Sequence, residues 1–76
     1  MGRTSTRGTG ETNQDLVGTV GHVTVPVSPT RAGEVMLPVR GAHEAFAAFS
    51  DESIGKHARV VVVECRSARS VTVTPC

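Results

Sequence analysis

The chain has 76 residues, a formal net charge of +1 and two aromatic side chains, both phenylalanine. A chain of this length forms one small domain of modest stability, which suggests support from a partner or a parent protein. The charge is too small for a general electrostatic attraction to nucleic acid or anionic lipid, and the sequence contains neither a membrane-spanning apolar run nor a signal peptide. We therefore expect a soluble chain.

Residues 1–15 (MGRTSTRGTGETNQD) contain no apolar residue after the initiator methionine. Such a segment buries too little apolar surface to offset the conformational entropy lost on ordering. We expect a flexible tail or linker over residues 1–15 and a folded domain over residues 16–76.

The first strand is predicted over residues 16–27, where valines alternate with polar residues. One face is expected to carry Val23, Val25 and Val27, and the other His22, Thr24 and Pro26. A glycine inside a strand marks a bulge, a bend or the close approach of another backbone. At Gly18 and Gly21 we expect a bend.

A turn of polar residues, proline and glycine over 28–33 separates this strand from a second one over 34–39. The two strands are expected to pair antiparallel. Val35, Leu37 and Val39 form one face of the second strand, and Glu34, Met36 and Pro38 form the other. Because proline lacks an amide donor, the side of the strand that Pro38 faces is expected to be an edge or a gap in the ladder.

Residues 41–49 (GAHEAFAAF) fit two structures. A helix would align Ala42, Ala45, Phe46 and Phe49, whereas a strand would align Ala45, Ala47 and Phe49. The segment follows a glycine turn and is too short to be stable as an isolated helix, so we predict a strand. In that register Phe49 is buried and Phe46 faces the opposite side.

Two further strands are predicted over residues 58–65 and 70–74, after a turn in which Ile54 acts as an apolar plug. Four consecutive valines, 60–63, indicate burial on both faces of the fourth strand. In the last strand Val71 and Val73 are expected to point inward, and Thr72 and Thr74 outward. Five short strands without a covering helix predict a small all-β barrel of the five-stranded OB-type Greek-key class, with an SH3-like barrel as the alternative.

The order and spacing of these segments resemble the C-terminal soluble domain of NfeD-type membrane proteins. The resemblance covers residues 16–75 and rests on six pieces: 16–21 (LVGTVG), 33–41 (GEVMLPVRG), 44–46 (EAF), Ile54, 60–64 (VVVVE) and 71–75 (VTVTP). It implies an OB-fold domain that follows membrane helices on the cytoplasmic side and is a partner of stomatin- and flotillin-like membrane scaffold proteins. This chain departs from the family in having no membrane helices or protease domain, and its turn before the fourth strand is Gly55-Lys56-His57-Ala58.

We therefore expect a non-enzymatic protein-interaction domain that docks a stomatin- or flotillin-like scaffold protein at the cytoplasmic face of the membrane. Exposed apolar side chains on a small domain often mark such an interface. The candidate contact residues are Met36 and Phe46, both on the less buried face of their predicted strands, with Arg40 as a neighbouring polar contact.

The alternative is an OB-fold module for single-stranded nucleic acid, which needs a basic groove with aromatic platforms. The chain has no tryptophan or tyrosine, and its two phenylalanines are expected mainly in the core. The cationic side chains are spread among acidic ones, so we expect no nucleic-acid partner.

Catalytic, cofactor and metal sites are not expected. His22, His43 and His57 lie in separate segments without ligand spacing. Cys65 and Cys76 do not form a metal or redox motif and are expected to be a strand thiol and a chain-end thiol. A Cys65–His57 nucleophile and base pair has no supporting motif.

Overall fold

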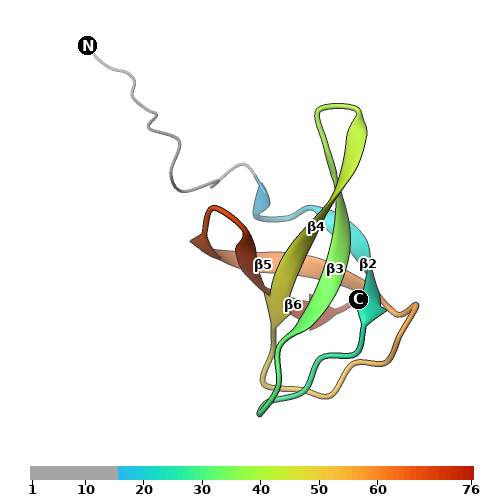
Figure 1. Ribbon diagram of the computed structural model, residues 1–76, viewed down its shortest axis with the longest axis vertical. Coiled ribbons are helices and arrows are strands. Elements are labelled where there is room, and N and C mark those ends of the chain that lie inside the picture. The colour runs from blue at the N-terminus through green and yellow to red at the C-terminus, as the bar shows by residue number, and fades with distance from the viewer. Residues whose placement is uncertain (1–15) are drawn as a thin grey trace.

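Five strands form in the part of the chain that the computed structural model describes, residues 16–76. They are β2 (Val20–Val25), β3 (Gly33–Val39), β4 (Ala42–Phe49), β5 (Arg59–Ser67) and β6 (Ser70–Pro75). Around the barrel their order is β2-β3-β4-β6-β5, and β5 closes onto β2 (Figure 1). The β4–β6 pair is parallel and the other pairs are antiparallel. This is the predicted OB-type Greek-key barrel rather than an SH3-like one. The expected tail, residues 1–15, lies outside the described residues.

The core is apolar and fills the inside of the barrel. Both predicted alternations in β3 and β6 are confirmed, with Val35, Leu37, Val71 and Val73 almost completely buried. Ile54 is also buried and exchanges two backbone hydrogen bonds with Val27, so it acts as the expected plug. The other buried members are Leu16, Val23, Val27, Phe46, Ala48, Val60 and Val62.

Residues 42–49 form the predicted strand, but its predicted facing is wrong. Phe46 is only 4% exposed, whereas Phe49 is half-buried. The cause is the pairing with β3, which runs without a register shift from Gly33–Ala48 to Val39–Ala42 and sets Phe46 directly opposite the buried Val35. Side chains that are opposite one another share a face, so this register turns Phe46 inward. The expected exposure of Phe46 is thus corrected.

Two valine predictions are also corrected. Val25 is 47% exposed because the β2–β3 register shifts between Val23 and Val25, which turns Val25 outward. In β5 the core receives Val60 and Val62, whereas Val61 is half-buried and Val63 is 48% exposed. Burial on both faces needs a second layer outside the barrel, and the described residues include no helix that covers β5.

Gly21 allows two strands to approach closely. A Cβ atom at this position would lie 2.3 Å from the Met36 carbonyl oxygen of β3. The expected bend in β2 is therefore better described as a close contact between backbones.

The β3–β4 hairpin extends beyond the rest of the barrel (Figure 1). Pairing of β3 with β2 ends at Met36, and pairing of β4 with β6 starts at Ala47. We refer to residues 38–45 as the ribbon. Its tip is a two-residue turn in which Arg40 (φ 53°) and Gly41 (φ 84°) both have positive φ, as a type I′ hairpin turn requires. Pro38 lies in the ribbon, beyond Met36, where the pairing of β3 with β2 ends, so its predicted place at a gap in the ladder is confirmed.

Candidate functional site

The outer surface of β2, β3 and β4 carries a small apolar face around Met36. Cross-strand pairing aligns His22, Met36 and Ala45 in one row, and Glu34 and Ala47 lie in the next. Met36 and Ala45 are half-buried and Ala47 is exposed. We call Met36, Ala45 and Ala47 the Met36 face. Side-chain alternation in β3 is sufficient to place Met36 outside, as the sequence predicted.

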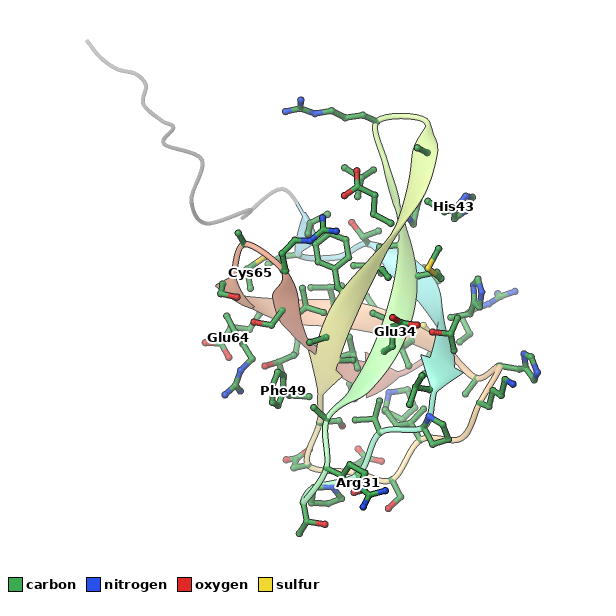
Figure 2. All side chains as sticks on the ribbon, viewed as in Figure 1. Arg31, Glu34, His43, Phe49, Glu64 and Cys65 are labelled. Atoms are coloured by element: carbon green, nitrogen blue, oxygen red, sulfur yellow. The ribbon has the colours of Figure 1, made fainter. Side chains whose placement is uncertain are left out.

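Polar groups border this face rather than occupy its centre. Glu34 accepts a 2.6 Å hydrogen bond from the Thr24 hydroxyl, which fixes its carboxylate beside β2. Figure 2 shows the Glu34 side chain beside β3 and the His43 side chain projecting from the ribbon. The outward positions of the described strands β2, β3 and β4 carry no lysine or arginine. The surface therefore has the composition of a protein contact rather than a phosphate contact.

A hollow of about 430 Å³ lies on the other side of the hairpin, at the foot of the ribbon. We call it the ribbon pocket. Its lining residues are Leu16, Thr19, Pro38, Val39, Arg40, Glu44, Phe46, Ala68 and Arg69. The structure thus brings two of the three predicted site residues, Arg40 and Phe46, to one pocket, and places Met36 on the opposite face of β3.

Arg69 connects the β5–β6 turn to the ribbon. Its guanidinium donates to Glu44 Oε1 at 2.8 Å and lies 5.3 Å from the centre of the Phe46 ring. Sequence reasoning did not find this contact, because the two residues are 25 positions apart and meet only through the parallel β4–β6 pairing. Phe46 therefore supports the pocket from the core instead of projecting toward a partner.

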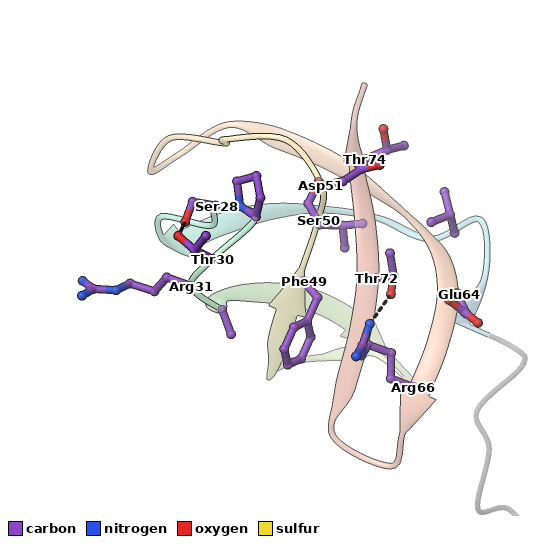
Figure 3. A pocket seen from close by; sticks show the side chains of 14 residues that line it. Ser28, Thr30, Arg31, Phe49, Ser50, Asp51, Glu64, Arg66, Thr72 and Thr74 are labelled. Atoms are coloured by element: carbon purple, nitrogen blue, oxygen red, sulfur yellow. Dashed lines mark hydrogen bonds between the residues drawn. The ribbon is translucent and has the colours of Figure 1, made fainter.

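An open groove of about 760 Å³ lies at the opposite end of the barrel, between the 28–32 loop, the end of β4 and the outer positions of β5 and β6 (Figure 3). Arg66 lies 4.2 Å from the centre of the Phe49 ring and donates weakly to the Thr72 hydroxyl at 3.5 Å. Arg31 points away from Phe49 in this view. Because Arg66 covers the half-buried Phe49 ring, this groove does not offer a nucleobase an uncovered aromatic platform.

Residues 16–76 contain no group of three or more histidine, cysteine or acidic side chains placed to hold a metal ion. Within the same residues, neither the half-buried Cys65 nor the exposed Cys76 forms a disulfide. No helix in this part of the chain has the length and apolar character needed to cross a membrane.

The family model for the NfeD C-terminal domain matches residues 20–74. The chain belongs to the NfeD family. The resemblance seen in the sequence is therefore confirmed over nearly all of the barrel. No curated protein matched the chain in a sequence search.

Solved structures of NfeD soluble domains have the same fold. The soluble domain of the NfeD protein YuaF from Bacillus subtilis is 30% identical, with a TM-score of 0.70, over 80% of this chain and 74% of that one. The C-terminal domain of the stomatin operon partner protein 1510-C from Pyrococcus horikoshii is 28% identical, with a TM-score of 0.61, over 91% of this chain and 97% of that one.

A third structure shows the fold at lower identity. It is the soluble domain of a membrane protein implicated in regulation of membrane protease activity, from Corynebacterium glutamicum, and is 18% identical with a TM-score of 0.60. The alignment covers 82% of this chain and 94% of that one.

Proposed function

We propose that this NfeD domain docks a stomatin- or flotillin-like scaffold protein at the cytoplasmic face of the membrane and performs no catalysis itself. Membership of the family supports the general role, and the Pyrococcus horikoshii relative is named a stomatin operon partner. The observation that carries the proposal is the Met36 face, a small, partly exposed apolar surface without cationic side chains on its three strands.

The composition of this face favours a protein over a nucleic acid. Single-strand binding by OB folds combines a basic groove with aromatic stacking. Here Phe46 is buried, Phe49 lies under Arg66, and Arg69 is paired with Glu44. By contrast, methionine is enriched at protein interfaces because its flexible thioether adapts to irregular partners.

The test is a binding measurement between the purified chain and a purified stomatin-family protein in nanodiscs. We expect Met36→Asp to weaken binding by about tenfold or more, because it places a charge at the centre of the apolar face. Val63→Asp is the matched control, since Val63 is 48% exposed on β5, two strands away, and its charge should leave binding unchanged.

Three outcomes would contradict the proposal. One is that the unmodified chain does not bind the scaffold protein, and another is that Met36→Asp binds as well as the unmodified chain. The third is recovery of nucleic acid that is released as salt is raised, which would favour the single-strand alternative. Thermal melting of both variants shows whether the fold has been kept.

A further inference from the structure

The ribbon has one open edge, and it lies on β4. The parallel β4–β6 pairing starts at Ala47, whose amide donates to the Arg69 carbonyl at 2.9 Å. In a strand, the amide and carbonyl groups of alternate residues point to the same side. The backbone groups of His43 and Ala45 therefore point to the side of β6, in a region where no described strand pairs with them.

The opposite edge of the ribbon is blocked. Since the backbone of Met36 faces β2, alternation turns the backbone of Pro38 toward β2 as well, and no described strand pairs with that side of β3 beyond Met36. Proline has no amide hydrogen to donate there. Blocking exposed edges with proline is a known protection against unwanted strand pairing, and here it protects β3 but leaves β4 open.

The open edge lies between two chemically different surfaces. Toward the outside, Ala45 belongs to the Met36 face, which is apolar and made of short side chains beside one methionine. Toward the inside lies the ribbon pocket, lined by the two arginines Arg40 and Arg69 and by one carboxylate, Glu44. Because Arg69 already neutralises Glu44 at 2.8 Å, the pocket keeps an excess of positive charge.

A strand added to this edge would alternate its side chains between these two surfaces. We propose that the β4 edge binds an extended segment of the docking partner by strand addition, with apolar side chains over the Met36 face and acidic side chains toward Arg40 and Arg69. The inference rests on the proposed docking function and specifies its binding mode. A second copy of this domain fits less well, because it would bring a second pair of these arginines to the same place.

Hydrogen exchange followed by NMR on the full chain tests the edge directly. In the free protein we expect the amides of His43 and Ala45 to exchange much faster than the amide of Ala47, which is bonded to Arg69. Protection of His43 and Ala45 equal to that of Ala47 would show that the edge is already covered, and would overturn the inference.

A displayed library of random linear peptides, selected on the immobilised full chain, supplies the probe. We expect the selected peptides to alternate apolar and acidic residues, and to slow exchange at His43 and Ala45 when added. Replacing their acidic residues with lysine should weaken binding, and Arg40→Glu should restore it. Failure to select any peptide, or selection of peptides that protect another surface, would overturn the inference.

Ala45→Pro is the decisive variant, because it removes the edge amide but no hydrogen bond of the barrel. It should keep the melting temperature within a few degrees and weaken peptide binding by about tenfold or more. Ala47→Pro is the control that loses the bond to Arg69 and should lower the melting temperature clearly. If Ala45→Pro does not fold, His43→Pro tests the same edge closer to the tip.

The results separate this inference from the proposed function. A stomatin-family protein that binds Ala45→Pro as tightly as the unmodified chain leaves docking in place and refutes strand addition. Peptides that protect His43 and Ala45, together with no binding of the scaffold protein, refute the docking role and leave the edge site standing. If the unmodified chain forms dimers and Ala45→Pro does not, the β4 edge binds a second copy of the chain rather than a partner segment. That result would overturn the proposal.

Discussion

The body of the barrel and the ribbon are built from the same two strands, β3 and β4, yet they have different physical roles. In the body, β3 pairs with β2 and β4, and β4 pairs with β3 and β6. The side chains of Val35, Leu37, Phe46 and Ala48 point into the closed core there. In residues 38–45 each strand keeps one neighbour. Because an isolated two-stranded hairpin is marginally stable in water, the body must support the ribbon. Continuous strands thus provide stability at one end and open backbone groups at the other.

The largest expected effect comes from the core of the body. Leu37→Ala should lower the free energy of unfolding by about 2–5 kcal/mol, because Leu37 is fully buried and its removal leaves a cavity. Urea denaturation measures this loss. Val39→Ala, two residues further along the strand and half-buried at the ribbon, should cost clearly less. Equal losses would break the distinction between body and ribbon.

Gly21→Ala should have the next largest effect. The added Cβ would lie 2.3 Å from the Met36 carbonyl oxygen, so the backbones of β2 and β3 must move apart, at a cost of about 1–3 kcal/mol. Gly55→Ala is the matched control, since an added Cβ there would meet nothing within 4 Å. A smaller loss for Gly21→Ala than for Gly55→Ala in thermal denaturation would contradict the described contact.

At the ribbon tip, Arg40→Asn should stabilise the protein by about 1 kcal/mol. Arg40 has φ 53°, a left-handed conformation that asparagine adopts more easily than arginine. We expect slower amide exchange around the turn and a small rise in the melting temperature. A fall in stability would show that the arginine side chain contributes more to the ribbon than its backbone conformation costs.

The smallest effect is expected for Arg69→Ala. The ion pair with Glu44 is exposed, with 67% of the Arg69 and 41% of the Glu44 side chain accessible, so its contribution is about 0.2–1 kcal/mol. The loss should shrink when salt is raised, because mobile ions screen exposed charges. A loss that does not change with salt would assign the effect to the Phe46 ring contact instead.

Strand positions followed from the sequence because valine alternation is a local signal, and it placed β3 and β6 with the correct faces. The sequence did not determine which side of β4 faces the core, because both sides are apolar. One side carries residues 45, 47 and 49, and the other carries residues 46 and 48. That choice depends on pairing with Val35, which lies in another strand. The register shift that exposes Val25 has no glycine or other local marker.

One part of the candidate site could also be predicted from the alternation of side chains along a strand. Met36 lies on the outer surface because its neighbours Val35 and Leu37 point inward, which alternation alone indicates. The Arg69–Glu44 contact and the open edge of β4 depend on where β6 begins to pair. That point is set by the topology of the closed barrel, and nothing in the ribbon sequence encodes it.

The parallel contact between β4 and β6 also bears on how this protein is made. Ribosomes synthesise β6 after the other four described strands, and β6 must enter between β4 and β5 to complete the ring. Until β6 has left the ribosome and paired, the edges of β4 and β5 that it joins have no partner strand. A released chain truncated just before Ser70 should therefore be bound by chaperones and degraded readily by proteases, and addition of the last strand should end both vulnerabilities together.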